Sequence, residues 1–555
     1  MAETYYNDAF IEVPVMSLTP SPRGRRAFRL CVLGMPMLLA VAGVGRAAAA
    51  AETQPIACAS LTSFKAPGYD MTIQSATEVP AGPPPPNPMG PPPEGTLPAY
   101  CRVDGVIDER VGKGGKPYAI GFAVAMPEKW NGRFLFQGGG GLNGAVNLPL
   151  GAQATGDTPA LARGYAIVST DSGHKGVVFD SSFFEDQEAT LNFLYQAIGK
   201  VAPVGKAIVA AHYGKPADRS YFVGCSTGGR EAMMMSQRYP RYFDGIVAGA
   251  PAMRTNFSNL ADKYITIQLN SVAPKNEAGK PDTARALSDG DKKLVVDSLL
   301  AACDARDGIA DGMIFDVRGC DFKPTSLICK GPKTDSCLTR EQAMAITKGF
   351  QGPRDSRGVP VYPGFWFDTG ITAKGAGIPG LLNPGPSPVG PPTYDTQMNV
   401  DREALAAANQ VAAVGDSAHW TQLNSFSGHG GKIIFYHGVS DPWFSAQDTT
   451  RYFEQLAADN GGADETAKWS RLYLVPGMGH CGGGQATLDR FDLLEPLVDW
   501  VEKGVAPEAV TATGRAFPKR SRPLCPYPKH AHYKGQGTAV RDSENATGFE
   551  CRGPT

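Results

Sequence analysis

The sequence has no excess of charge of either sign. It carries 53 lysines and arginines against 54 aspartates and glutamates, which gives a net charge of −1 over 555 residues. Apart from the N-terminus, it has no long run of like charges. Proteins that bind nucleic acid or an anionic membrane through their surface carry a basic patch, and this composition gives no sign of one. We therefore expect a small ligand and no nucleic-acid partner.

The N-terminal region lacks an apolar run long enough to cross a membrane comfortably. Its apolar run, Leu30–Ala42, follows Arg25 and Arg26 and precedes the small residues Ala47–Ala51. This order is typical of an export signal. Residues 1–51 are therefore predicted to be removed on export by the Sec or the twin-arginine route. The mature protein would be secreted or periplasmic, with no membrane partner; a retained N-terminal anchor is the alternative.

A dinucleotide-binding fingerprint is also missing. Gly138–Gly141 form a glycine-rich turn after the predicted strand Arg133–Gln137. However, no G-x-G-x-x-G opens a helix, and no acidic residue ends a second strand about 20 positions later. We therefore expect no organic cofactor. A turn of this kind is better suited to present a backbone N–H to a developing oxyanion, as in esterases, although it could be only a flexible loop.

The most informative motif that is present is Gly224–Gly228, which reads Gly-Cys-Ser-Thr-Gly. It follows the apolar run Tyr221–Val223 and precedes Glu231–Gln237, a segment rich in helix formers. A G-x-S-x-G between a strand and a helix is typical of a nucleophile elbow, because its glycines permit a turn too tight for a Cβ atom. We predict that Ser226 is a catalytic nucleophile.

An acid and a histidine follow Ser226, each directly after a predicted strand. Asp441 comes after Lys432–Gly438, and His480 comes after Arg471–Val475. The chain order Ser, Asp, His is that of an α/β-hydrolase. Because a serine hydroxyl is inert near neutral pH, His480 would take its proton and Asp441 would hold the imidazole in the useful tautomer. The alternatives are a surface aspartate in a turn and a histidine that caps a strand.

Strands and helices alternate through the first half of the chain. Further strands are predicted at Tyr118–Met126, Ala166–Asp171 and Ile246–Pro251, and a helix is predicted at about 187–213 before the elbow strand. This alternation predicts an α/β fold of the α/β-hydrolase type, with a doubly wound, mainly parallel sheet that begins at Tyr118.

A long insertion separates the two parts of this predicted core, 52–252 and 431–555. The insertion covers residues 253–430, about 175 residues. Insertions at the carboxyl ends of strands stand over the active site, so we expect a lid that shapes the substrate pocket.

The cysteines support export. Of the 11 cysteines, Cys31 lies in the predicted signal, which leaves an even ten, as expected in an oxidising compartment. Cys225 precedes Ser226 and Cys481 follows the candidate base. If the serine and histidine are within hydrogen-bonding reach, these neighbours are near enough for a disulfide; two unrelated buried thiols are the alternative. Spacing alone does not give the other pairings.

The insertion contains an acidic loop, Asp304–Gly312, with three aspartates. Carboxylates are among the hard oxygen ligands that Ca²⁺ prefers, and the glycines permit tight turns. The spacing is not that of an EF-hand, and no glutamate closes the loop. From the residues alone, a calcium site and a solvated acidic turn are equally open.

Five of these residues together resemble the CS-D-HC signature of the tannase and feruloyl esterase family: Cys225, Ser226, Asp441, His480 and Cys481. Members of that family are secreted α/β-hydrolases that act on aromatic carboxylic esters. The resemblance runs from about Cys58 to Cys551, apart from part of the insertion. Met126–Phe134 and Arg522–Pro528 resemble one bacterial branch in particular, the mono(2-hydroxyethyl) terephthalate hydrolases.

The resemblance implies several further site residues. It assigns the oxyanion donors to the backbone N–H groups of Gly141 and Thr227, and it places Phe444 at the pocket. It implies a structural calcium ion held by Asp304, Asp307, Asp311 and the backbone carbonyls of Ile309 and Met313. It also implies five disulfides: Cys58 with Cys101, Cys225 with Cys481, Cys303 with Cys320, Cys329 with Cys337, and Cys525 with Cys551.

The prediction is a monomeric, secreted serine carboxylesterase that hydrolyses small aromatic esters of the hydroxycinnamoyl or galloyl type through an acyl-enzyme on Ser226. The first alternative is a mono(2-hydroxyethyl) terephthalate hydrolase. Two departures count against it: Thr227 stands where that branch has an acid, and the Gly- and Pro-rich residues 375–392 lack its Trp-, Arg- and Phe-bearing lid segment. The remaining candidate aromatic walls, for which core packing is the alternative, are Phe365, Trp366, Phe367 and Trp420.

Two readings from outside this chemistry remain. One is a catalytically silent protein that binds phenolic compounds, against which an intact triad argues. The other is a peptidase with the same triad, which only the resemblance disfavours.

Overall fold

The computed structural model describes residues 54–85, 95–374, 379–384, 391–535 and 542–554. The predicted export signal lies outside the described residues, as does part of the Gly- and Pro-rich stretch 375–392. All described residues belong to one unit of the chain, residues 51–555. Among them, no helix combines the length and the apolarity needed to cross a membrane.

Nine strands form the central sheet, in the order β1-β2-β3-β5-β4-β6-β7-β8-β9. The strands β1, β2 and β3 each run antiparallel to the next strand in the sheet, and the six strands from β5 to β9 run parallel to one another. The bounds are β1 Met71–Val79, β2 Tyr100–Val111, β3 Pro117–Pro127, β4 Arg133–Gln137, β5 Ala166–Thr170, β6 Arg219–Cys225, β7 Gly245–Gly249, β8 Lys432–Gly438 and β9 Ser470–Val475.

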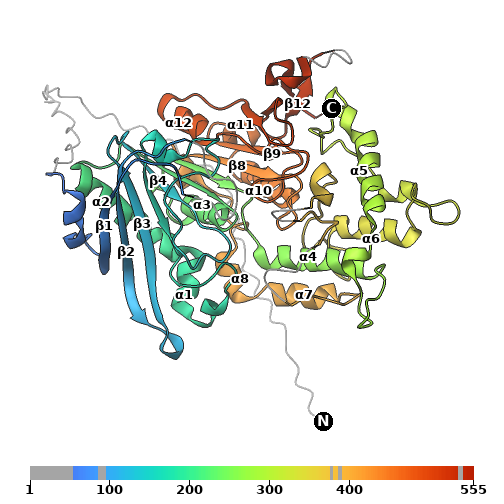
Figure 1. Ribbon diagram of the computed structural model, residues 1–555, viewed down its shortest axis with the longest axis horizontal. Helices are drawn as coiled ribbons and strands as arrows, with labels where there is room; N and C mark the ends of the chain where they lie inside the picture. Colours follow the sequence, from blue (N-terminus) through green and yellow to red (C-terminus); the bar gives the residue numbers. More distant parts are fainter. Residues whose placement is uncertain (1–53, 86–94, 375–378, 385–390, 536–541, 555) are drawn as a thin grey trace, which may run out of the picture. The chain divides into compact units, whose positions relative to one another are not determined.

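This sheet confirms the predicted fold class, with one correction. The sequence analysis begins the sheet at Tyr118, whereas the structure begins it at Met71 (Figure 1). The two extra strands, β1 and β2, pair with each other over almost their whole length and carry only part of their residues to the core. A strand half exposed in this way gives a weak apolar signal, which explains why it was missed.

Helices cover both faces of the sheet because successive strand residues point to opposite sides. In β6, Phe222 packs in the core with α2 and α3, whereas Tyr221 and Val223 pack in the core with α12. The covering helices are α1 Gln187–Leu191, α2 Ala197–Tyr213, α3 Thr227–Arg238 and α10 Ala446–Asp459 on the first side, with α11 Ala463–Thr466 beside α10, and α12 Leu494–Lys503 on the second.

The helix predicted at 187–213 is interrupted. The π-helical turn Asn192–Gln196 lies between α1 and α2 and carries Phe193 and Leu194. Single π-helical turns occur frequently at functional sites, and no local sequence pattern signals one.

The C-terminal hairpins pack with α12 and consist of β10 Val510–Thr513 with β11 Ser521–Leu524, and β12 His530–Tyr533 with β13 Phe549–Arg552.

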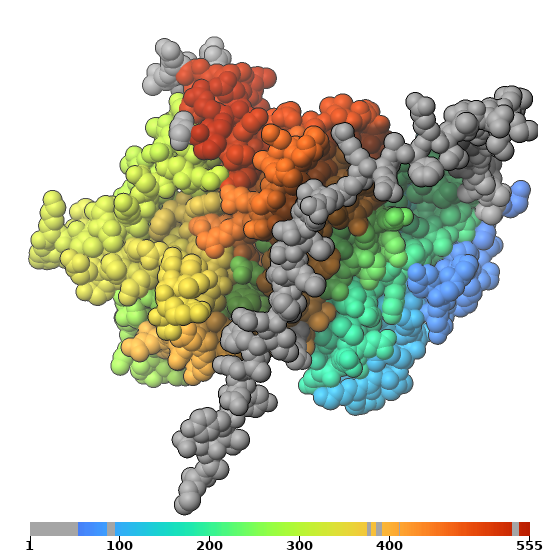
Figure 2. Space-filling model, turned by 180° about the vertical axis from the view of Figure 1, so that it is seen from behind, coloured from blue at the N-terminus to red at the C-terminus, as the bar shows by residue number. Residues whose placement is uncertain are grey.

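The chain between β7 and β8 has a hydrophobic core of its own. Apolar side chains of α4, α5 and α6, among them Ile265, Leu299 and Ile346, form one buried cluster separate from those of the sheet. Figure 1 shows these helices gathered at one end, away from β1 to β3, and Figure 2 shows the same arrangement from behind. The whole chain between β7 and β8 contains the helices α4 Thr255–Asn270, α5 Asp289–Cys303, α6 Arg340–Gln351, α7 Val400–Ala407, α8 Gln410–Gly415 and α9 Asn424–Ser427.

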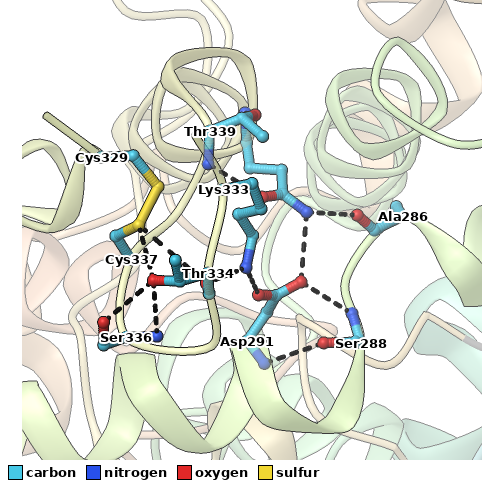
Figure 3. Close-up of polar contacts among 10 residues, drawn as sticks. Ala286, Ser288, Asp291, Cys329, Lys333, Thr334, Ser336, Cys337 and Thr339 are labelled. Atoms are coloured by element: carbon cyan, nitrogen blue, oxygen red, sulfur yellow. Dashed lines mark hydrogen bonds and ion pairs between the residues drawn. A yellow bond between two sulfur atoms is a disulfide. The ribbon is translucent and has the colours of Figure 1, made fainter. Parts of the chain in front are cut away.

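A disulfide-bonded loop is tied to this cluster through Asp291 (Figure 3). The Nζ atom of Lys333, which lies between Cys329 and Cys337, is 2.7 Å from Oδ1 of Asp291. The other carboxylate oxygen accepts from the N–H of Ser288, in a capping box that starts α5. The disulfide therefore closes the loop on itself, and the ion pair between Lys333 and Asp291 joins the loop to α5.

The structure contains five disulfides, at the pairs that the family resemblance implies: Cys58–Cys101, Cys225–Cys481, Cys303–Cys320, Cys329–Cys337 and Cys525–Cys551. Disulfides at this density fit an oxidising compartment.

Candidate active site

Ser226 lies in a strained turn between β6 and α3. Its backbone has φ 64° and ψ −123°, a region that a non-glycine residue rarely adopts. A Cβ atom on Gly224 would lie 2.5 Å from the carbonyl oxygen of Gly228, so this close approach requires glycine. The N–H of Ser226 donates to the carbonyl of Gly249 at 3.0 Å, which fixes the turn to β7. This is the geometry of a nucleophile elbow.

Asp441 and His480 form a close buried pair. They follow the neighbouring parallel strands β8 and β9, whose carboxyl ends meet at one edge of the sheet. Nδ1 of His480 is 2.7 Å from Oδ2 of Asp441. The other oxygen, Oδ1, accepts from the N–H groups of Trp443 and Phe444 at 2.9 and 3.1 Å. The burial of Asp441 raises its pKa, but the charge of His480 and the side-chain hydrogen bonds of His437 and His480 outweigh this effect, so the pKa lies below its ordinary value.

A disulfide joins the residue before Ser226 to the residue after His480. Cys225 and Cys481 are 256 positions apart in sequence, and their Cα atoms are 6.0 Å apart. The structure records no hydrogen bond between Oγ of Ser226 and His480. Nε2 of His480 is buried, and it has no hydrogen-bond partner among the described residues. It is therefore the ring nitrogen that is free to accept the proton of the serine.

His437 is a second histidine at Asp441, and the sequence analysis gave it no role. It is fully buried, and its Nε2 lies 3.3 Å from Oδ2 of Asp441 and 3.0 Å from the carbonyl of Phe444. Since a carbonyl can only accept, Nε2 carries a hydrogen. Nδ1 lies 2.8 Å from Oγ1 of Thr449. His437 therefore donates to the carboxylate and to the segment that follows it.

The two backbone N–H groups that the resemblance assigns to the oxyanion belong to residues that line the cavity with Ser226. Neither the N–H of Gly141 nor that of Thr227 has an acceptor among the residues that the structure describes. The hydroxyl of Thr227 donates to the carbonyl of Gly141, which joins the glycine-rich turn to the start of α3. Both residues line the same cavity as Ser226.

Glu231 holds this glycine-rich turn from inside. The side chain is buried in α3 and accepts from the N–H of Gly139 at 2.8 Å, from Oγ of Ser172 at 3.0 Å and from Nδ2 of Asn143 at 3.2 Å. Burial raises the pKa of Glu231, although these hydrogen bonds and Arg230 oppose the increase. From the sequence, Glu231 was predicted only to be part of a helix, because its hydrogen-bond partners are remote in sequence.

Asp368, from the chain inserted between β7 and β8, connects the loops that carry Asp441 and His480. It is fully buried, and its Oδ2 accepts from Oγ of Ser440 at 2.8 Å and from the N–H of Gly477 at 2.6 Å. Ser440 directly precedes Asp441, and Gly477 lies three residues before His480. Burial raises the pKa of Asp368.

A cavity of about 1690 Å³ opens beside the serine. Three aromatic side chains line it near His480: the ring centroids of Trp443 and Phe444 lie 5.0 and 5.3 Å from the imidazole, and Phe179 packs edge-on against Trp443 at 5.8 Å. Phe179 has φ 70°, which is strained for a bulky residue. The sequence analysis placed only Phe444 here.

The other aromatic candidates do not line this cavity. Phe365 is buried in the core of the inserted chain, and the ring of Phe367 stacks on that of Phe350 with centroids 4.3 Å apart. Trp366 lies between Phe365 and Phe367 in sequence. Trp420 is 61% exposed. Core packing therefore accounts for Phe365 and Phe367, which was the alternative interpretation for these residues.

The acidic loop brings its aspartates into one buried turn. Asp307 is 1% and Asp304 is 7% exposed, and neither has an ion-pair partner among the described residues. Burial raises the pKa of Asp307 to about 8, and nearby Asp311 adds to the increase. Arg522 and Arg520 pair with Asp311. The carboxylates of Asp304, Asp307 and Asp311 are suitable calcium donors, but their oxygens do not lie as close together as the potential ligand atoms of Cys58, Glu78 and Cys101. In that closer group, the two cysteines form a disulfide.

A mainly parallel sheet with a G-x-S-x-G elbow after β6, an acid after β8 and a histidine after β9 defines an α/β-hydrolase. The family model described as tannase and feruloyl esterase matches residues 101–384 and 388–551. The chain therefore belongs to the tannase and feruloyl esterase family, and it is a carboxylic ester hydrolase.

Individual relatives agree with this placement. The chain is 37% identical over 523 residues to the mono(2-hydroxyethyl) terephthalate hydrolase of Piscinibacter sakaiensis, which covers 82% of this chain and 85% of that protein. It is 29% identical over 569 residues to a probable feruloyl esterase of Arthroderma benhamiae, with 93% and 98% covered. Among solved structures, feruloyl esterase B from Aspergillus oryzae superposes with a TM-score of 0.68 at 26% identity, covering 87% of this chain and 97% of that one.

Proposed function

We propose that the protein is a secreted serine carboxylesterase that hydrolyses aromatic esters through Ser226, His480 and Asp441. The observation that carries the proposal is the short His480–Asp441 contact, 2.7 Å, with a disulfide joining the residues next to Ser226 and His480. This arrangement leaves Nε2 of His480 free to act as a base, and it fixes the two catalytic loops against each other.

The reaction proceeds in two halves. Nε2 of His480 takes the hydroxyl proton as Oγ of Ser226 attacks the ester carbonyl carbon, and the N–H groups of Gly141 and Thr227 hold the oxyanion. The tetrahedral intermediate collapses, the bond to the alcohol oxygen breaks, and His480 returns the proton to the leaving alcohol. Water, activated by the same nitrogen, then releases the acid and restores the serine.

The acyl half of the substrate is proposed to be aromatic. Trp443, Phe444 and Phe179 lie around His480 and offer ring faces and edges against which a flat acid can stack. A hydroxycinnamoyl or galloyl ester is the first choice. Mono(2-hydroxyethyl) terephthalate stays the second choice because the relative of that name is 37% identical to this chain.

A matched panel of esters tests this proposal. Purified mature protein is assayed with methyl ferulate, methyl gallate, mono(2-hydroxyethyl) terephthalate and a p-nitrophenyl ester, beside Ser226→Ala and Ser236→Ala. Ser236 is a buried serine of α3, the helix that follows Ser226. Its hydroxyl donates to the carbonyl of Met233, and it does not line the cavity, so it is the matched control. We expect turnover of an aromatic ester that only Ser226→Ala abolishes. No turnover of any ester, with Ser226 unreactive to a fluorophosphonate in folded protein, would favour a silent phenolic-binding protein instead.

Calcium is proposed as a structural ion of the acidic loop, held by Asp304, Asp307 and Asp311 with the carbonyls of Ile309 and Met313. Support comes from the burial of Asp304 and Asp307 without a paired cation in the described part of the chain. The ion would neutralise these carboxylates and brace the loop. Metal analysis of protein purified without chelator checks the proposal, and a metal-free sample would contradict it.

The remaining parts of the proposal concern organisation and export. The residues 253–430 form a lid over the cavity, between core parts 52–252 and 431–555, and the mature protein is a secreted or periplasmic monomer that has lost residues 1–51. Light scattering of the purified protein gives its mass in solution, and N-terminal sequencing of exported protein locates the cleavage site.

A further inference from the structure

The carboxylate of Asp441 is buried, and all of its hydrogen-bonding positions are in use. Oδ1 accepts from the N–H groups of Trp443 and Phe444. Oδ2 lies 2.7 Å from Nδ1 of His480 and 3.3 Å from Nε2 of His437. Two carboxylate oxygens offer about four lone-pair sites, and these four N–H groups fill them. The two histidines therefore share one oxygen, the one that faces the proposed base.

The ring of His437 is fixed by contacts at both of its nitrogens. His437 lies on β8 and is fully buried. Its Nδ1 lies 2.8 Å from Oγ1 of Thr449 on α10, and its Nε2 lies 3.0 Å from the carbonyl of Phe444. The hydrogen on Nε2 is therefore shared between that carbonyl and Oδ2 of Asp441. Turning the ring would leave polar groups unpaired in the interior, which costs free energy.

This hydrogen bond changes the charge that His480 meets. Burial raises the pKa of Asp441, and the charge of His480 together with the hydrogen bond of His437 lowers it by more than burial raises it. A carboxylate that already accepts from one histidine attracts a proton on a second histidine less strongly. Without His437, Oδ2 would therefore hold the imidazolium form of His480 more tightly.

We infer that His437 is a positioning residue of the proposed reaction, which keeps His480 unprotonated, and so able to act as the base, at lower pH than Asp441 alone would allow. The inference rests on the proposed function, because it concerns the base of that reaction. His437 does not line the cavity, so it acts through Asp441 and does not touch the substrate.

The other ionisable groups around Asp441 are the same with and without His437. Tyr362 and Asp368 approach it from the inserted chain. Burial raises the pKa of Tyr362 well above its ordinary value, so this phenol stays neutral, and burial also raises the pKa of Asp368. On α10, Asp448 is paired with Arg254. A change in pH dependence that follows a substitution of His437 alone therefore reports on the pair of Asp441 and His480.

The test is the pH dependence of kcat/KM for p-nitrophenyl acetate from about pH 5 to 9, the range in which a histidine base titrates. The variants are His437→Phe, which keeps a flat ring without nitrogens, and His437→Gln, which keeps an N–H near the position of Nε2. In wild type, kcat/KM rises with pH as His480 loses its proton. The midpoint of this rise should move up by about one pH unit in His437→Phe, the size expected for a shared hydrogen bond to a charged group. In His437→Gln it should stay close to the wild-type value.

A purely structural role would give a different result, in which kcat/KM falls by one factor at every pH and the midpoint does not move. His212→Phe is the matched control, because His212 lies on α2, bonds to the carbonyl of Ile56 and does not line the cavity. The control should keep the wild-type midpoint and plateau. An unmoved midpoint in folded His437→Phe would overturn the inference.

A second measurement covers the case in which His437→Phe does not fold. Nitrogen-15 NMR of histidine-labelled protein should show a hydrogen on Nε2 of His437, with a resonance that shifts in Asp441→Asn. An Nε2 without a hydrogen, or a resonance that does not shift, would overturn the inference. If wild-type protein hydrolyses no ester, the proposed function itself fails.

Discussion

Replacing Asp441 by asparagine tests the proposed catalytic residues directly. In the structure, Oδ1 of Asp441 accepts from the two backbone N–H groups of Trp443 and Phe444 at 2.9 and 3.1 Å, and Oδ2 faces Nδ1 of His480 at 2.7 Å. An asparagine has one acceptor oxygen and one donor nitrogen. The oxygen stays on the two backbone donors, so the NH₂ group faces the histidine.

The consequence is the wrong tautomer of His480. Its Nδ1 must now accept from the amide, and the ring hydrogen moves to Nε2, which then has no lone pair for the proton of Ser226. Such a change lowers kcat by about 10⁴ in a serine protease triad, which corresponds to about 5 kcal/mol in the barrier. KM should change little, because Asp441 is fully buried and does not line the cavity.

The assay is kcat for a p-nitrophenyl ester, together with the rate of fluorophosphonate labelling at Ser226. Circular dichroism and thermal unfolding establish that the variant is folded. Asp459→Asn, an aspartate of α10 that bonds only to Thr421 and Gln455, is the matched control. A folded Asp441→Asn protein that keeps more than a tenth of the wild-type kcat would refute the assignment of Asp441 as the group that orients the base.

Three further predictions follow from buried groups. Glu231→Gln should lower kcat about tenfold or more with little change in KM, because an amide nitrogen facing Asn143 loosens the oxyanion turn; equal changes in both constants would contradict this. Burial raises the pKa of Asp171 from 3.8 to about 7, so ionising it destabilises the native state as pH rises from about 4 to 7. Asp171→Asn keeps both backbone hydrogen bonds. Its free energy of unfolding in urea, measured relative to that of the wild type, should therefore rise by about 2 kcal/mol between pH 5 and 7.5. A difference between the two proteins that does not depend on pH would count against this prediction. Replacing Cys225 and Cys481 by serine opens a 256-residue loop and should cost about 5 kcal/mol in unfolding free energy and lower kcat; an unchanged kcat would show that the bond does not position the serine.

The sequence predicts those structural features that depend only on residues close together in the chain. The elbow at Ser226 needs two glycines, a strand and a helix within a few residues, and each is visible in the sequence. The strands β8 and β9, buried on both faces, read as near-continuous apolar runs, and so the positions after them, Asp441 and His480, could be identified.

Contacts between residues that lie far apart in the sequence were not predicted. Asp368 is 72 residues from Ser440 and 109 from Gly477, and no spacing rule links positions so far apart. His437 was visible only as a residue of a buried strand, and its contact with Asp441 depends on how the turn after β8 bends. The half-exposed strands β1 and β2 were overlooked because their apolar signal is weak. Phe444 was placed at the pocket only through the family resemblance, and nothing in the sequence pattern pointed to its neighbour Trp443.

The placement of Asp368 has a consequence for how such enzymes diversify. The inserted chain supplies the carboxylate that joins the loops of Asp441 and His480, so it supports the proposed catalytic residues as well as forming a wall of the cavity. Exchanging this segment between relatives would replace a structural partner of the triad together with the pocket. Chimeric enzymes built at the ends of β7 and β8 should therefore work only when the incoming segment brings an equivalent acid.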